Sequence, residues 1–365
     1  MKKIMSLCIV LLLLAMTACS PSAPKSNQAS TSSKESNKQI TIAGNGGKIE
    51  KVIREEIAPK FEAETGIKVN YLAGLSGEIL SKLELQKNAP KIDIALFVPL
   101  DVYRANEKGL IESVDETSVP NLKNLDSKYV AFENLTTPAF GLVIAPAYNT
   151  KTFEQNGIKP IESWNDLARA DYKGKTAFAD ISNDWGFNSL YSLALANGGN
   201  EDNLEPGLKK AKELAGYSAT FYKNSTQMMP ALQQGAADVT VMGSYVTADL
   251  AVNSGVPLKM VVPKEGVYMN AFNAGLVKNT PNKEAAIKFI NYLISEEAQK
   301  ATADQGFYPV VQGISIPEKY EKVIGLKDTD KIYTFDIKKL AESRAEWTDR
   351  WSKEVTPQLG TLVKK

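Results

Sequence analysis

Residues 91–97, KIDIALF, form an almost unbroken apolar run of strand length. Such a run is typical of a strand that is buried on both faces in the middle of a parallel sheet. A helical pattern led in by residues 74–77 precedes the run, and a second one follows it at 101–108. A strand flanked by helices at this spacing predicts βαβ units. Asp93, inside the run, is expected to serve the fold rather than a ligand.

The same alternation of strands and helices continues along the chain. Upstream, a strand at 40–43 leads through a glycine-rich turn into a helix that ends at Gly66, and another strand covers 67–72. The turn lacks the third glycine of a dinucleotide-binding loop, and no GxxxxGK[ST] sequence occurs, so neither nucleotide site is indicated. Downstream we predict strands at 176–179, 220–222, 238–242 and 258–262, and helices that end at 197 or cover 226–234 and 245–253.

The composition excludes several classes of function. The chain has 365 residues, enough for two domains. Its 43 basic and 42 acidic side chains leave no surplus charge for a phosphate backbone, so we predict no nucleic-acid partner. It has no histidine, which excludes Ser-His-Asp and Cys-His catalytic sites and His-ligated zinc or haem. We therefore predict no catalytic residue, no metal site and no cofactor.

Residues 1–18 have the pattern of a cleaved lipoprotein signal peptide. Lys2 and Lys3 form a basic start, and residues 4–18 are a nearly uncharged apolar run. A helix of this length rises about 22 Å, less than the roughly 30 Å core of a bilayer, so it is no membrane span. Thr17-Ala18-Cys19 resembles the bacterial lipobox, in which cleavage precedes a cysteine whose thiol is acylated. An ordinary cleaved signal that happens to contain a cysteine is the alternative.

Residues 19–39 are predicted to form a tether. They are rich in serine and contain no aromatic residue, so they bury too little apolar area to fold. A flexible segment of this length reaches about 25 Å, enough to hold a folded body near a membrane. A disordered terminus without a role fits the composition equally well, but an acylated Cys19 before it favours the tether. Cys8 lies in the removed segment, so the mature chain has no disulfide.

Small, polar and aromatic residues follow several of the predicted strands. In open α/β sheets the ligand lies beyond the carboxyl ends of the strands, so these residues are candidate ligand contacts. Exposed N–H groups at helix starts suit an anionic group, and an aromatic ring beside an aspartate suits an amine. The candidates at strand ends are Asn45, Ser76, Gly77, Phe97, Ser182, Asn183, Asp184, Trp185, Ser244 and Tyr245.

The candidates also have purely structural interpretations. Ser76 and Ser182 can cap helices, and Asp184 can complement a helix dipole. Trp185 and Tyr245 can be packing residues. The coincidence of such residues at successive strand ends favours a ligand site.

A separate stripe at helical spacing lies near the C-terminus. It consists of Ile337, Leu340, Trp347 and Trp351, and we predict that it packs in the core.

Five segments together resemble the extracellular solute-binding proteins of bacterial ABC importers. They stand in that family's order: APKFEAETGIKV at 58–69, ESWNDLARADYKGKTAF at 162–178, MMPALQQGAADVTVM at 228–242, SGVPLKMVVPKEG at 254–266 and NTPNKEAAIKFINYLIS at 279–295. The likeness covers nearly all of residues 40–365. It points to the type II branch that includes polyamine, ferric-iron, thiamine and aminophosphonate binders.

This resemblance implies an α/β, two-lobe type II periplasmic-binding-protein fold with two interdomain crossing strands. The crossings then fall at 139–144 and near 263–266. Residues 40–142 and 264–365 would form lobe 1, and residues 143–263 would form lobe 2.

The resemblance also implies a small polar, amine-containing solute: a polyamine, an aminophosphonate or an amino-acid-like molecule. Tyr268 and Asn270 join the candidate ligand contacts through it. Ferric-binding members carry adjacent tyrosines after the strand that corresponds to 238–242, whereas Tyr245 stands alone here. Ferric ion is therefore disfavoured.

We predict an extracytoplasmic, monomeric binding protein, anchored to the cell membrane through Cys19, that closes on its solute and delivers it to an ABC permease. One competing prediction is an anchored hydrolase that uses paired carboxylates, which requires two acids in one cleft. Asp184 has no evident carboxylate partner by motif. The other competing prediction is a surface adhesin or scaffold.

Overall fold

The computed structural model describes residues 39–132, 134–334 and 336–363. The predicted signal peptide, Cys19 and the predicted tether up to residue 38 lie outside the described residues. Gln39, the last residue of the predicted tether, is the first residue of strand β1. Within the described ranges, no helix is both long and apolar enough to cross a membrane.

Strands and helices alternate along the chain, as predicted. The strands are β1 (Gln39–Gly44), β2 (Lys68–Ala73), β3 (Ile94–Phe97), β4 (Ile111–Glu112), β5 (Thr137–Asn149), β6 (Thr176–Ala179), β7 (Ser218–Tyr222), β8 (Val239–Gly243), β9 (Leu258–Met260), β10 (Val267–Val277) and β11 (Ile332–Tyr333). The α-helices are α1 (Lys48–Val52), α2 (Ala58–Thr65), α3 (Ser76–Leu85), α4 (Pro99–Glu107), α5 (Thr150–Gln155), α6 (Asp184–Ala196), α7 (Glu205–Tyr217), α8 (Ser225–Gln233), α9 (Ser244–Ala248), α10 (Lys283–Leu293), α11 (Glu296–Ala303), α12 (Glu318–Ile324) and α13 (Ile337–Glu354). Short π-helical segments continue α1 and α9, at Ile53–Ile57 and Asp249–Asn253. Five 3₁₀ segments are Pro120–Asn124, Ser127–Tyr129, Trp164–Ala168, Ala170–Tyr172 and Thr356–Gln358.

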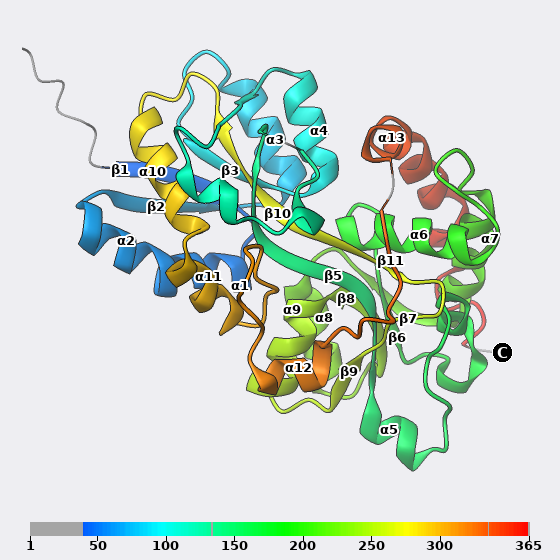
Figure 1. Cartoon of the computed structure of the whole chain (residues 1–365). Helices are drawn as coiled ribbons and strands as arrows, with labels where there is room; N and C mark the ends of the chain where they lie inside the picture. The colour runs from blue at the N-terminus through cyan, green and yellow to red at the C-terminus, as the bar shows by residue number, and fades with distance from the viewer. Residues whose placement is uncertain (1–38, 133, 335, 364–365) are drawn as a thin grey trace, which may run out of the picture. The chain divides into compact units, whose positions relative to one another are not determined.

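One mixed sheet organises these elements, with its main strands in the order β2-β1-β3-β10-β5-β8-β6-β7. β1 pairs in parallel with β2 and β3, and β6 pairs in parallel with β7 and β8. β5 and β10 are antiparallel to each other, and they also pair with β8 and β3, respectively. These two long strands therefore link the two parallel groups (Figure 1).

The two linking strands confirm the predicted fold class. The first predicted crossing, 139–144, lies inside β5, and β10 begins directly after the predicted return at 263–266. The prediction that residues 91–97 form a strand between two parallel neighbours was only half correct. β3 has the parallel β1 on one side and the antiparallel β10 on the other, because β10 returns from the second group of strands.

The helical run from α1 to α2 shows how the sequence pattern sets the packing. Its apolar face is buried, with exposed fractions of 0 to 1 % for Ile49, Val52, Ile53, Ile57 and Phe61. The run ends at Gly66, whose φ of 69° lies in the left-handed region that glycine adopts without a Cβ penalty. This helix therefore covers one face of β1 and β2 through apolar contacts.

Asp93 serves the fold, as predicted. Its Oδ2 accepts the backbone N–H of Thr41 at 2.6 Å. Its Oδ1 accepts the side-chain amide of Asn282 at 3.1 Å and the Thr280 hydroxyl. The buried carboxylate thereby ties β1 to the turn before α10.

The C-terminal helix α13 confirms the predicted core stripe, since Leu340, Trp347 and Trp351 are buried. Trp351 packs between Phe178 of β6 and Phe221 of β7, with ring centroids 6.3 and 5.7 Å away. The C-terminal part of α13 therefore packs on strands of the predicted lobe 2. An apolar stripe shows that a helix is buried but not which lobe buries it.

Another part of α13 faces α4 of the predicted lobe 1, as Figure 1 shows. The Tyr103 hydroxyl of α4 donates to Glu342 of α13 at 3.3 Å. α13 thus contacts elements on both sides of the crossing strands β5 and β10.

Candidate functional site

A cleft of about 600 Å³ lies beyond the carboxyl ends of the parallel strands. The segments that follow β1, β2, β3, β6, β7 and β8 all contribute to it, and most of them are the first turns of helices. The lining residues are Asn45, Gly46, Gly47, Ala73, Gly74, Leu75, Ser76, Gly77, Glu78, Val98, Asp101, Arg104, Ser182, Asn183, Asp184, Trp185, Asn224, Ser225, Thr226, Tyr245, Phe272 and Arg344.

The structure brings most of the predicted ligand contacts to this cleft. Those that line it are Asn45, Ser76, Gly77, Ser182, Asn183, Asp184, Trp185 and Tyr245. They come from strand ends on both sides of the crossing strands. The prediction from strand ends thus identified residues that are far apart in sequence but line the same cleft.

Four predicted contacts lie outside the lining. Phe97 is fully buried among core residues of α3 and α4, because the strand alternates its side chains and Val98 is the next residue to face the cleft. The Ser244 hydroxyl is buried and accepts the N–H of Val143 at 3.2 Å. Tyr268 stacks on Tyr333, with centroids 6.5 Å apart, and Asn270 on the same strand is 6 % exposed.

Several lining residues were not predicted. Residues 224–226 follow β7, so the strand-end argument would have found them had it been applied to that strand. Asp101 lies in the first turn of α4 and Arg104 one turn further on, and neither directly follows the end of β3. Arg344 comes from α13, which was predicted to be core.

The interpretation of the two serines as helix caps was wrong for both. The Ser76 hydroxyl does not cap α3 but accepts the N–H of Val98 at 3.2 Å, which ties the start of α3 to the end of β3. Asn183, rather than Ser182, caps α6 by accepting the N–H of Trp185 at 2.8 Å. Ser182 instead donates its backbone N–H to Asp180 at 3.0 Å.

Two aromatic rings form one wall of the cleft. Trp185 and Tyr245 meet edge to face, with centroids 6.2 Å apart and an interplanar angle of 68°. Tyr245 stacks on Phe307 at 4.4 Å. A Cβ on Gly243 would lie 2.8 Å from the Tyr245 ring and 3.1 Å from the Trp185 ring, so only glycine admits both rings there. Trp185 and Tyr245 are therefore both cleft residues and core residues.

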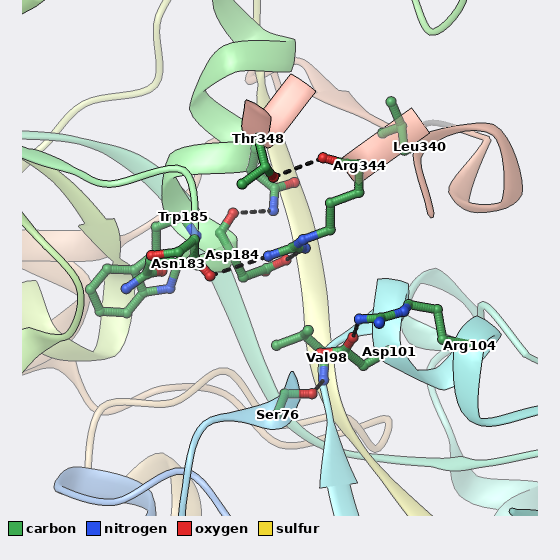
Figure 2. A network of polar contacts seen from close by, with 12 residues as sticks. Ser76, Val98, Asp101, Arg104, Asn183, Asp184, Trp185, Leu340, Arg344 and Thr348 are labelled. Atoms are coloured by element: carbon green, nitrogen blue, oxygen red, sulfur yellow. Dashed lines mark hydrogen bonds and ion pairs between the residues drawn. The ribbon is translucent and has the colours of Figure 1, made fainter. Parts of the chain in front are cut away.

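Asp184, the first residue of α6, lies near the guanidinium of Arg344. The Arg344 Nη1 to Asp184 Oδ1 distance is 3.9 Å, and the two side chains are 17 % and 13 % exposed. Burial raises the pKa of Asp184 to about 6, because desolvation outweighs the opposing charge of Arg344, and the negative charge of Asp101 adds to the rise. Figure 2 shows Arg344 extending from α13 toward Asp184.

A second charged pair lies on the opposite side of the cleft. Asp101 is 4 % exposed and accepts a hydrogen bond from Arg104 Nη1 at 2.9 Å. Figure 2 shows this pair beside Ser76 and Val98. The cleft thus contains two arginines and two aspartates, with Glu78 engaged in accepting the N–H of Leu75 at 3.0 Å.

An ion pair beside the cleft joins α1 to the helix after α9. Lys48 Nζ donates to Asp249 Oδ1 at 2.7 Å and to the Gln305 side-chain oxygen at 2.9 Å. The Lys48 side chain is 11 % exposed and that of Asp249 is 22 % exposed, so solvent screens this pair only in part. It links the two predicted lobes next to Gly47, a lining residue of the cleft.

The family model described as "Bacterial extracellular solute-binding protein" matches residues 56–327. The chain belongs to this family. This match confirms the predicted resemblance to bacterial extracellular solute-binding proteins.

Two curated relatives have different named solutes. Iron uptake protein A1 of Synechocystis is 29% identical over 284 residues, covering 72% of this chain and 73% of that protein. The spermidine/putrescine-binding periplasmic protein of Salmonella typhimurium is 27% identical over 264 residues, covering 68% and 72%. Since these names disagree, they leave the solute of this chain open.

Among solved structures, the periplasmic binding protein AfuA from Actinobacillus pleuropneumoniae, with fructose-6-phosphate bound, superposes with a TM-score of 0.73. It is 22% identical, and the match covers 87% of this chain and 98% of that one. This likeness shows the shared fold.

The cleft of this solute-binding protein offers groups of both charges rather than a metal site. Over the described ranges, no group of three or more Asp, Glu, His or Cys side chains is placed to hold a metal ion. Burial raises the pKa of the Tyr245 phenol, which disfavours the phenolate that a ferric ion would need. The arginines and helix starts suit an anion, and Asp184 beside Trp185 suits an amine.

Proposed function

We propose that this solute-binding protein is anchored to the cell membrane through an acylated Cys19 and captures a small polar, amine-containing solute for an ABC permease. Among the three solute classes, we favour an aminophosphonate or an amino-acid-like molecule. The observation that carries this choice is the charge content of the cleft, where Arg104 and Arg344 accompany Asp101 and Asp184. A molecule with an amine and an acidic group complements both signs.

Groups of both signs lie side by side in the cleft, since Arg344 Nη1 is 3.9 Å from Asp184 Oδ1, so the acid and the amine of the solute would be held close together. The first turns of α3, α6 and α8 line the cleft with the positive ends of their helix dipoles, and Arg344 adds a full positive charge. Asp184 and the Trp185 ring form the part that suits an ammonium group. A linear polyamine has no acidic end, so it would offer no acceptor to the buried Nη1 of Arg344.

Closure of two lobes supplies the mechanism that we propose. In this proposal, residues 40–142 and 264–336 form lobe 1, and residues 143–263 form lobe 2. We assign α13 to lobe 2 because Trp351 packs on β6 and β7. A bound solute contacts residues such as Ser76 and Asp184 at once, so it stabilises the closed arrangement over the open one. We expect the protein to act as a monomer without chemical turnover.

A thermal-shift screen of the processed chain tests the solute class. The panel contains aminophosphonates, amino acids, polyamines, thiamine and ferric salts. We expect stabilisation by solutes that carry both an amine and an acid, since a ligand of the folded state raises the melting temperature. Stabilisation by polyamines alone would refute the zwitterion, and no stabilisation by any small solute would remove the support for capture.

Two further measurements test closure and the anchor. Small-angle scattering with and without a stabilising solute should show a smaller radius of gyration when the solute is bound. Cells given labelled palmitate should label the wild-type chain but not Cys19→Ala. Label on the variant would place the acyl group elsewhere, and an unlabelled wild type would mean an ordinary signal peptide.

One observation supports the hydrolase as a second candidate function. Asp184 lacked an evident carboxylate partner in the sequence, but Asp101 lies in the same cleft and its charge raises the pKa of Asp184. Paired carboxylates at suitable distance are the requirement for such a hydrolase. Turnover of a stabilising solute that disappears in Asp184→Asn would favour the enzyme, and unchanged solute after long incubation would favour the carrier.

A further inference from the structure

Arg344 occupies an unusual position on α13. Leu340, Trp347 and Trp351 form the buried stripe of the helix, and Arg344 falls four residues after Leu340 and three before Trp347. Side chains at such spacing share one helix face. A charged residue therefore stands where the helix otherwise presents apolar side chains to the protein.

The neighbours of Arg344 fix its guanidinium at the edge of the cleft. The carbon of the guanidinium lies 5.1 Å from the centre of the Phe187 ring. Nη2 donates to the backbone carbonyl of Ser182 at 3.3 Å. The Arg344 carbonyl also accepts the Thr348 hydroxyl at 2.7 Å, as Figure 2 shows.

A second nitrogen of the guanidinium, Nη1, has no hydrogen-bond acceptor among the described residues. Nη1 is buried, and among the described residues it makes no hydrogen bond. The nearest carboxylate oxygen, Oδ1 of Asp184, is 3.9 Å away, which is too long for a hydrogen bond. A buried charged donor without an acceptor is unfavourable, so this nitrogen is prepared for an acceptor that the described part of the chain does not supply.

Arg104 differs from Arg344 in its hydrogen bonding and in its exposure. Its Nη1 already donates to Asp101 at 2.9 Å, and its side chain is 41 % exposed. Glu78 on the same side accepts a backbone N–H. Arg344 is thus the cleft arginine with a buried, unused donor in the described part of the chain.

We infer that Arg344 is the specificity-determining residue for the anionic end of the solute, and that its Nη1 donates to an oxygen of a phosphonate, phosphate or carboxylate group. This inference rests on the proposed function and adds the residue that selects the acidic group. The planar guanidinium matches the paired oxygens of such groups, and the first turn of α6 beside it adds a favourable dipole. The anion is therefore held on the side of the cleft to which α13 is attached.

The test measures the binding of three probes to the processed full chain by isothermal titration calorimetry. Inorganic phosphate is the anion alone, putrescine is the amine alone, and 2-aminoethylphosphonate carries both groups. The variants are Arg344→Gln, Arg344→Lys and the matched control Arg350→Gln. Arg350 lies on the same helix but pairs with Glu205 and Glu354 outside the cleft lining.

We expect Arg344→Gln to weaken phosphate and 2-aminoethylphosphonate binding by about tenfold or more. Putrescine binding should not weaken, because the variant removes a positive charge 3.9 Å from Asp184, the proposed amine contact. Arg344→Lys should retain part of the anion affinity, because it keeps the charge but not the paired donors. Arg350→Gln should lower the melting temperature, while its affinities for the three probes stay at the wild-type values. Circular dichroism of each variant establishes that it is folded.

Two outcomes overturn the inference. Anion binding that is equal in wild type and folded Arg344→Gln would show that another group holds the anion, even while the proposed function stands. Loss of putrescine binding together with anion binding would show a general structural effect. If wild type binds 2-aminoethylphosphonate no better than putrescine, the proposal that the solute carries both an amine and an acid is refuted. That outcome is distinct from a failure of the role inferred for Arg344.

Discussion

Replacing Asp184 by asparagine should stabilise this protein at neutral pH. Burial raises the pKa of the Asp184 carboxyl from 3.8 to about 6, although the charge of Arg344 opposes the rise. A raised pKa means that the folded chain holds this proton more tightly than the unfolded chain does. The stability that the proton contributes is fully present below about pH 4 and is lost as the pH rises through about 6.

The expected size follows from the two pKa values. A change from 3.8 to about 6 corresponds to about 3 kcal/mol of unfolding free energy at neutral pH. Asparagine at the first position of α6 loses a helix-dipole interaction of about 0.5 kcal/mol. We therefore expect Asp184→Asn to be more stable than wild type by about 2 kcal/mol at neutral pH, with a gain that shrinks toward pH 4.

Urea unfolding across this pH range measures the difference directly. Asp328→Asn, which replaces an exposed aspartate, controls for the loss of one carboxylate. A variant that is less stable than wild type at neutral pH, by an amount that does not vary with pH, would refute the reasoning. The expected gain also bears on function, because a carboxylate that lowers stability at neutral pH is explained if a bound amine compensates it.

Three further changes probe other parts of the structure. Gly186→Ala places a Cβ 2.2 Å from the Asp180 carbonyl oxygen, so urea unfolding should show a loss of about 3 kcal/mol; wild-type stability would mean that this turn can shift. Lys48→Met removes the partner of Asp249 and should lower the unfolding free energy by about 2 kcal/mol, with Lys51→Met as the exposed control; equal effects would argue against the buried pair. Ferric salts should produce no tyrosinate-to-iron absorption band, because burial raises the pKa of the Tyr245 phenol; a band that Tyr245→Phe abolishes would contradict this.

Local patterns predicted most of the fold because most elements are decided by residues near in sequence. The strand at 176–179 matches β6, and the helix that ends at Gly66 ends there in the structure. β10 was missed as an eleven-residue strand, and the return crossing was placed near 263–266, directly before it. Its sequence mixes apolar residues with Asn270 and Asn273, so it shows neither alternation nor a pure apolar run. It is buried along its whole length by neighbours on both sides, which no local pattern reveals.

The site was predictable where it depends on strand ends and unpredictable where it depends on which way a side chain points. Phe97 and Val98 illustrate the difference, since neighbours on a strand face opposite sides. Val98 lines the cleft and Phe97 lies in the core. A strand end can be placed from sequence to within about two residues, but a shift of one residue exchanges the two faces.

Arg344 shows a different limit and a signal that was available. The apolar stripe of α13 predicts correctly that this face is buried, and Arg344 lies on the same face. A buried arginine needs acceptors, so an arginine inside such a stripe indicates that part of the covered surface is polar. The sequence does not say what that surface is, because the Ser182 carbonyl and Asp184 lie more than a hundred residues earlier. A charged residue that interrupts an apolar stripe is therefore a reason to search for a site beneath the helix, and here that search leads to the cleft.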